Sequence, residues 1–292
     1  MTTLTESSAA ELFRQAPDRM LDVGIAEAAY RRVGTGPDVL FVHGWPVSGA
    51  TWRRLLPLLA DHVTCHIVDL PGAGDSRFLA DAPLSVQSHI ESVRAIVDLL
   101  ELDDVAVIGH DSGGMIARHA MAGDPRLRAM GLVNTEMPSG LDWRFRSFLA
   151  LRRVPGVAGI LGWLVGQPTL RRNGFVLGDA FADKSLLDGE FDEFFLQPIH
   201  TDAHRRAAAI KVLKSFDENH VNDLAEVHAR IDVPVQMVWG AEDPFFPIAK
   251  ARDMVGTFAD ANLVELDGVG LFSHEEAPER VAAALLPTLT GG

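Results

Sequence analysis

The 292-residue sequence has one cysteine, one tyrosine and no long hydrophobic run. A single cysteine, Cys65, excludes an intramolecular disulfide and is typical of a reducing compartment. The longest apolar stretch, between Pro155 and Pro168, is shorter than the ~20 residues that a membrane-spanning helix needs. The N-terminus has neither the basic residues nor the apolar segment of a signal peptide. We therefore expect a soluble, cytoplasmic protein without a membrane partner.

Basic residues are also scarce, since 26 lysines and arginines stand against 40 aspartates and glutamates, for a net charge of −14. A surface of that sign repels nucleic acid, so nucleic acid is not an expected partner. The remaining composition is that of an ordinary globular protein with a sizeable core. We expect neither a metal nor a cofactor.

Short apolar runs alternate with segments of helical periodicity. The runs predict strands at 38–44, 66–70, 105–109, 130–133, 235–239 and 262–266. The helical patterns include 86–100, 114–122, 248–258 and 278–286. Unbroken apolar strands separated by helices are typical of a parallel sheet covered on both faces, which is an α/β fold.

Residues 139–224 differ from the rest, because they contain arginine pairs, aromatic residues and helical spacing but no convincing strand. We predict that they form a helical cap inserted into a core made of residues 1–138 and 225–292. A cap suits an enzyme that excludes water and binds an apolar substrate.

Residues 109–114 read Gly-His-Asp-Ser-Gly-Gly, directly after a predicted strand and before a predicted helix. A nucleophile elbow has the form Gly-x-nucleophile-x-Gly in that context. The register puts Asp111 at the nucleophile position, and sliding to Ser112 would put His110 where the first glycine belongs. The alternative role for Asp111 is a plain helix cap. As a nucleophile, a carboxylate attacks an sp³ carbon and forms an alkyl-enzyme ester, so alkyl halides or epoxides are the expected substrates.

His43-Gly-Trp-Pro46 stands at the end of an earlier predicted strand. In a fold with this elbow, the loop after that strand and the residue after the nucleophile supply the amides of the oxyanion hole. We therefore expect the backbone N–H groups of Trp45 and Ser112 to stabilise the tetrahedral intermediate of ester hydrolysis.

Three motifs together resemble the α/β-hydrolase superfamily: His43-Gly-Trp-Pro46, Asp69-Leu-Pro-Gly-Ala-Gly-Asp-Ser76 and Gly109-His-Asp-Ser-Gly-Gly114. Within it they resemble the branch of epoxide hydrolases, haloalkane dehalogenases and haloacetate dehalogenases. The resemblance covers nearly the whole chain and is loosest in the cap. It implies an α/β-hydrolase fold, with a mostly parallel sheet flanked by helices and an inserted helical cap. It also implies that the Trp45–Pro46 bond is cis, as it often is in this branch.

The resemblance indicates a triad acid in Trp239-Gly-Ala-Glu-Asp-Pro-Phe-Phe-Pro247, where Asp243 is the candidate. Such an acid orients a histidine and stabilises its charged form. Asn134 and Glu136 occupy the region that some dehalogenases use instead.

The triad histidine of this branch stands in Gly-His-Phe-x-x-Glu-Glu-x-Pro. Counting back from Pro278 puts Leu271 in the histidine position, and a looser register puts Phe272 there. Neither residue can accept a proton. His274 could replace the base only if the loop were reshaped. Displacement by Asp111 needs no base, but hydrolysis of the ester does, and losing a general base costs about 10²–10⁴ in rate.

Each activity of the branch lacks a residue in this chain. Epoxide hydrolases use cap tyrosines, but the only tyrosine is Tyr30, before the first motif. After the nucleophile, haloalkane dehalogenases usually have tryptophan and haloacetate dehalogenases arginine, whereas this chain has Ser112. In the cap, Trp143 and Trp163 could bind a halide through their indole N–H groups. The cap histidines that could protonate an oxygen are His200, His204 and His220.

We predict a dehalogenase-type reaction on a small hydrophobic organic substrate, with ester hydrolysis impaired at Leu271. Two alternatives stay open. The first is an epoxide hydrolase. The second is a non-hydrolytic homologue that binds a ligand or catalyses a rearrangement, which the apolar residue at 271 would suit.

Overall fold

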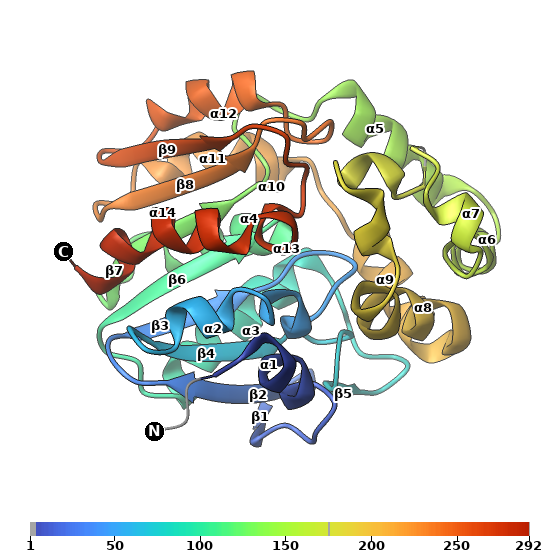
Figure 1. The fold of residues 1–292 in the computed structure, drawn as a ribbon, viewed down its shortest axis with the longest axis horizontal. Helices are drawn as coiled ribbons and strands as arrows, with labels where there is room; N and C mark the ends of the chain where they lie inside the picture. Colours follow the sequence, from blue (N-terminus) through green and yellow to red (C-terminus); the bar gives the residue numbers. More distant parts are fainter. Residues whose placement is uncertain (1–3, 175, 292) are drawn as a thin grey trace.

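The computed structural model describes residues 4–174 and 176–291 (Figure 1). Within these residues, one nine-stranded sheet has the order β1-β2-β4-β3-β6-β7-β8-β9, and β5 pairs with β2. Six strands run parallel to one another, namely β4, β3, β6, β7, β8 and β9. The strands β1, β2 and β5 pair antiparallel. The strands are β1 (Arg19–Asp22), β2 (Ala26–Gly34), β3 (Asp38–Val42), β4 (Thr64–Asp69), β5 (Arg77–Phe78), β6 (Val105–His110), β7 (Leu127–Val133), β8 (Val235–Gly240) and β9 (Ala261–Leu266).

The parallel part of the sheet confirms the six predicted strands, because β3, β4, β6, β7, β8 and β9 each overlap one of them. The antiparallel strands β1, β2 and β5 were not predicted. They contain arginine, aspartate or glutamate and are partly exposed, so they lack the unbroken apolar pattern of a buried parallel strand.

Helices cover both faces of the sheet, since alternate residues of β3 and β6 belong to two different hydrophobic clusters. The cluster with Leu40 and Val107 packs against α3 (Val86–Leu99), α4 (Ser112–Met121) and α12 (Ile248–Val255). The cluster with Phe41 and Ile108 packs against α2 (Leu56–Leu59) and α14 (Pro278–Thr290). The predicted helices therefore appear as α3, α4, α12 and α14. Short helices also form at α1 (Glu6–Leu12), η1 (Gly49–Trp52) and α13 (Ser273–Glu276).

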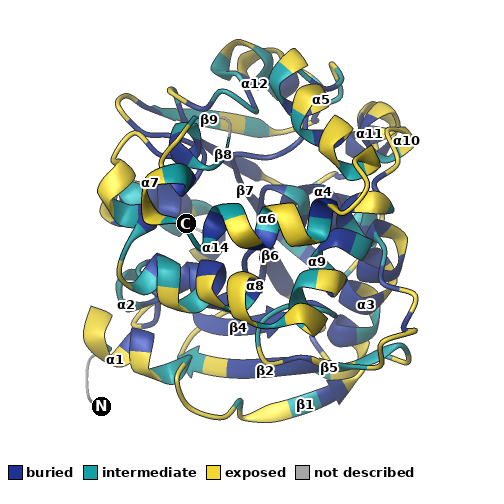
Figure 2. Ribbon diagram, turned by 90° about the vertical axis from the view of Figure 1, so that its right-hand side faces the viewer, coloured by how far each residue is buried: buried dark blue, intermediate teal, exposed yellow. Residues whose placement is uncertain are grey.

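Between β7 and β8, the described residues form helices and no strand. Figure 1 shows α5 to α9 gathered beside the sheet, and in Figure 2 exposed residues cover the outer faces of α6 and α8, with buried strands behind them. The α-helices are α5 (Trp143–Ala150), α6 (Val157–Val165), α7 (Pro168–Arg171), α8 (Gln197–Thr201), α9 (Ala203–Lys214), α10 (Asn219–Asn222) and α11 (Leu224–His228). Single turns form at η2 (Leu151–Arg153), η3 (Gly178–Ala180), η4 (Lys184–Leu187) and the π-turn η5 (Asp192–Leu196).

Across the described part of the chain, the length and apolarity required to cross a bilayer are not found together in any helix.

Candidate active site

Asp111 stands at the tip of a sharp turn between β6 and α4, with φ 50° and ψ −137°. A positive φ is costly for a residue with a Cβ and tends to persist at functional sites. The turn is packed so closely that a Cβ on Gly109 would lie 2.5 Å from the Cα of Gly114. The side chain of Asp111 makes no hydrogen bond to the backbone of the helix as a cap. The geometry is that of a nucleophile elbow with Asp111, not Ser112, at its tip.

The carboxylate of Asp111 is held by the amides that the sequence nominates for an oxyanion hole. The Trp45 N–H donates to Oδ2 of Asp111 over 2.8 Å, and the Trp45–Pro46 bond is cis. The adjacent backbone N–H and hydroxyl of Ser112 favour the ionised form of the same carboxylate. A Cβ on Gly44 would lie 2.5 Å from this Oδ2, so glycine lets the loop approach. Burial nevertheless raises the pKa of Asp111 to about 6, and these hydrogen bonds only partly oppose it.

Asp111 faces a cavity of about 80 Å³, which we call the apolar cavity. Among the described residues around it, the two with ionisable side chains are Asp111 and Glu136. Its other walls come from α3 and α4, from strand-end loops and from the segment between β7 and β8. The lining includes Trp45, Pro46, Ile116, Phe145, Phe148, Leu149, Leu177, Leu213, Phe216, Phe245, Leu271 and Phe272. Such a lining suits a hydrophobic substrate.

Asp243, the candidate acid, follows β8. It is buried, but it is not one of the residues that line the apolar cavity. Its Oδ1 accepts hydrogen bonds from the backbone N–H groups of Phe245 and Phe246 at 2.8 and 3.1 Å. Its Oδ2 accepts one from the Asn134 side chain at 2.8 Å. Burial raises the pKa of Asp243 to about 7. The carboxyl group is therefore hydrogen-bonded without a histidine.

Leu271 and Phe272 both line the apolar cavity, so the wall that would carry the family's base is aliphatic and aromatic. His274 does not line it. This histidine is fully buried, and its Nε2 lies 2.7 Å from Oγ1 of Thr51. Burial is the main cause that holds the pKa of His274 well below its ordinary value, and the neighbouring His110 is the second cause. A rescue role for His274 as a base is therefore not supported.

Trp143 and Trp163, the predicted substrate contacts, are 65% and 56% exposed and do not line the apolar cavity. The prediction is corrected, because both side chains lie on the outer faces of α5 and α6. The residues of α5 that do line the apolar cavity are Phe145, Phe148 and Leu149, which were not predicted from the sequence. Their i, i+3, i+4 spacing is the pattern of one helix face and could have indicated them.

The other residues weighed for substrate chemistry also lie outside the apolar cavity. His200 contacts the main-chain oxygen of Gly162 through Nδ1 at 2.8 Å, and the ring of His204 stacks on Phe78. His220 is near the surface, and Tyr30 is buried with its hydroxyl 2.8 Å from a ring nitrogen of His66. None of these side chains is placed to protonate a bound substrate there.

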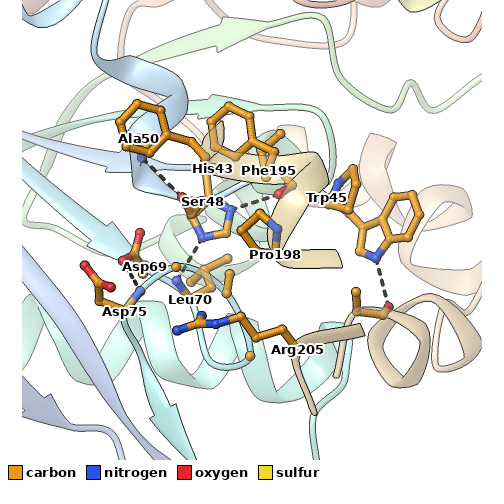
Figure 3. Close-up of a pocket in the computed structure, with 18 of the residues that line it drawn as sticks. His43, Trp45, Ser48, Ala50, Asp69, Leu70, Asp75, Phe195, Pro198 and Arg205 are labelled. Atoms are coloured by element: carbon orange, nitrogen blue, oxygen red, sulfur yellow. Dashed lines mark hydrogen bonds between the residues drawn. The ribbon is translucent and has the colours of Figure 1, made fainter. Parts of the chain in front are cut away.

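A second, more polar cavity of about 230 Å³ adjoins the first and shares part of its wall, namely Trp45, Pro46, Ser112 and Val212. Figure 3 shows its labelled side chains, which include His43, Asp69 and Arg205. Nε2 of His43 accepts from the Leu70 N–H at 2.9 Å, and Asp69 accepts from the Gly49 N–H at 2.7 Å. The glycine-rich loop after β4 is thus hydrogen-bonded to the segment that follows β3. No group of His, Cys, Asp or Glu among residues 4–174 and 176–291 is arranged to hold a metal ion.

Comparison with known proteins agrees with this geometry. The chain belongs to the α/β hydrolase family, whose sequence model matches residues 39–284. It is 28% identical to a pimeloyl-[acyl-carrier protein] methyl ester esterase of Chromobacterium violaceum over 267 residues, 88% of this chain and 96% of that protein. It is also 28% identical to haloalkane dehalogenase 2 of Mycobacterium tuberculosis over 277 residues, 92% of this chain and 93% of that protein. The epoxide hydrolase CorEH shares its fold, with a TM-score of 0.78 at 19% identity over 94% of this chain and 98% of the other.

Proposed function

We propose that this α/β hydrolase attacks an sp³ carbon of a small hydrophobic alkyl halide with Asp111 and forms an alkyl-enzyme ester. The observation that carries the proposal is the placement of Asp111. It stands at the elbow tip, one carboxylate oxygen is held by the Trp45 N–H, and the side chain faces an apolar cavity.

In the first step, a carboxylate oxygen of Asp111 forms a C–O bond while the carbon–halogen bond breaks and halide leaves with the electron pair. The Trp45 amide fixes the orientation of the carboxylate for this attack. No proton transfer is required, because Asp111 is largely ionised at neutral pH.

In the second step, water adds to the Cγ carbon of the ester. The oxyanion that forms would lie beside the backbone N–H groups of Trp45 and Ser112. Water must lose a proton in this step, and the apolar side chain of Leu271 cannot take it. We therefore expect the ester to persist much longer than in an enzyme with histidine at this position.

Two alternative functions would use the same site. An epoxide would give the same kind of ester, with a hydroxyl group on the alkyl part. The apolar wall at Leu271 and Phe272 favours a non-hydrolytic homologue that binds a ligand in the cavity or rearranges it. Ester hydrolysis, the activity named for the esterase relative, would need a nucleophile that a base deprotonates, which Asp111 is not.

Intact-mass spectrometry tests the proposal with 1-bromobutane and 1,2-epoxybutane as probes. One butyl group added to the protein, located at Asp111 by peptide mapping and accompanied by one equivalent of bromide, is the expected result. Asp111→Asn should abolish it. Asp253→Asn, the same change at an exposed position on α12, should leave it unchanged. A hydroxybutyl adduct alone would favour the epoxide. No adduct with either probe, or an adduct that survives Asp111→Asn, would overturn the proposal.

A further inference from the structure

Glu136 is a buried carboxyl group that faces the same cavity as Asp111. It follows β7, is 1% exposed and lines the apolar cavity. Among the described residues, its Oε1 has no hydrogen-bond partner. The nearby Arg118 donates to the main-chain oxygen of Glu136 at 2.8 Å rather than to its carboxylate. A buried carboxyl group with so few hydrogen bonds is unusual and calls for a functional explanation.

The hydroxyl of Thr135 indicates where a proton resides. Its Oγ1 lies 2.9 Å from Nη2 of Arg118, 2.8 Å from the main-chain oxygen of Asp111 and 3.1 Å from Oε2 of Glu136. A hydroxyl group has one proton and two lone pairs. Arg118 can only donate and the main-chain oxygen can only accept. Three separate two-centre hydrogen bonds form only if Glu136 is protonated on Oε2 and donates to Thr135, since the hydroxyl proton would otherwise be shared between Oε2 and the main-chain oxygen of Asp111.

The electrostatics of the cavity agree with that assignment. Burial, together with the charge of Asp111, raises the pKa of Glu136 to about 8, above that of Asp111. Arg118, itself fully buried, opposes the effect only in part. At neutral pH the pair therefore holds one proton, which sits on Glu136 and leaves Asp111 ionised for attack.

We propose that Glu136 is the general base of the ester hydrolysis, in place of the histidine that residue 271 lacks. This inference rests on the proposed function of Asp111. Alkylation converts Asp111 into a neutral ester and removes the negative charge that keeps Glu136 protonated. Glu136 then releases its proton to solvent more readily, so the formation of the intermediate itself prepares the base.

The proton balance of the step is complete. Ionised Glu136 takes a proton from a water molecule whose oxygen forms a bond to Cγ of the Asp111 ester. The tetrahedral intermediate collapses, the bond between Cγ and the alkoxy oxygen breaks, and the alkoxide takes the proton from Glu136. The acid proton left on Asp111 passes to Glu136 and restores the starting state. With the proton released earlier, one halide, one proton and one alcohol leave in each cycle.

The test follows the decay of a preformed adduct. The protein is alkylated with 1-bromobutane, the reagent is removed, and loss of the butyl group is followed by intact mass between pH 5 and 9. In the native protein the decay rate should rise with pH and level off as Glu136 ionises. In Glu136→Gln the adduct should form but decay about 10²-fold or more slowly, without that pH dependence. Glu279→Gln, at an exposed position on α14, should decay as the native protein does.

The outcomes separate the two proposals. Absence of any adduct in the native protein would overturn the role of Asp111 and, with it, that of Glu136. A normal adduct that decays in Glu136→Gln at the native rate and pH profile would overturn the role of Glu136 alone. If Glu136→Gln fails to fold or to alkylate, Glu136→Asp decides, because it keeps the carboxyl group one methylene shorter. Its adduct should decay more slowly but with the pH dependence retained, and a pH-independent decay would overturn the inference.

Discussion

Asn134 donates a side-chain hydrogen bond to Oδ2 of Asp243 over 2.8 Å, and its own Oδ1 accepts from the Gly240 N–H and the Ser273 hydroxyl. The amide thereby ties the end of β7 to the loops after β8 and β9. These are the loops that carry the candidate acid and the position of the missing base. The acid site is therefore complete in its hydrogen bonds although residue 271 has no ring nitrogen to offer it.

The apolar residue at 271 gives the first prediction. Leu271→His should place a base on the wall of the apolar cavity, where Asp243 or Glu136 could orient it. We expect the butyl ester of Asp111 to decay faster than in the native protein, because water can then be deprotonated by an imidazole as well as by Glu136. Continuous bromide release over many turnovers is the measurement. Leu271→Asn, which is polar but not basic, is the control and should not accelerate the decay. Equal decay in Leu271→His and the native protein would contradict the assignment of position 271.

The pH dependence of alkylation gives the second prediction. Only the ionised form of Asp111 attacks carbon, and burial raises its pKa to about 6. The rate of adduct formation should therefore be constant above that pH and fall about tenfold per unit below it. The measurement is the initial rate of bromide release from 1-bromobutane between pH 4.5 and 8. A rate that stays level down to pH 4.5 would mean that Asp111 ionises as an exposed aspartate does.

Some of this site follows from local sequence and some does not. The elbow was predicted because it depends on a few consecutive residues with special backbone geometry. The cis Trp45–Pro46 bond was implied by the resemblance to the epoxide hydrolase and dehalogenase branch. The link between Asn134 and Asp243 was not predicted, because it joins residues 109 apart in the chain.

The cap shows a second limit of the sequence. Trp143 and Trp163 were chosen for their chemistry, but composition does not say which face of a helix turns inward. Both tryptophans are exposed in the structure. The apolar residues of α5 that do line the cavity, Phe145 and Phe148, are three positions apart. Periodicity was the better guide here than residue type.

Close packing under the elbow gives the third prediction. A Cβ on Gly44 would lie 2.5 Å from both Cβ and Oδ2 of Asp111. Gly44→Ala should therefore displace the carboxylate, reduce alkylation by at least about tenfold and destabilise the fold by about 1–3 kcal/mol. The control is Gly159→Ala in α6, where an added Cβ meets no atom within 4 Å. That change should leave alkylation intact and stabilise the protein by up to about 1 kcal/mol. Native alkylation in Gly44→Ala would show that the loop yields and that the contact does not position Asp111.

The buried proton on Glu136 gives the last prediction, which concerns stability. The pKa of Glu136 is raised on folding, from an ordinary value of 4.5 to about 8. Its contribution to stability is therefore fully present below pH 4.5 and is lost as pH rises towards 8, because the folded protein must then bury a charge. Glutamine has the same shape and never ionises. Relative to the native protein, Glu136→Gln should become more stable by at least about 1.4 kcal/mol, the value of one pKa unit, between pH 5 and pH 8. Urea denaturation at pH 5, 6, 7 and 8 measures the difference, and Glu279→Gln should show no such trend. A difference that stays constant over this range would mean that Glu136 is already ionised in the folded protein at pH 5, and that Asp111 is not the acid that gives up its proton first.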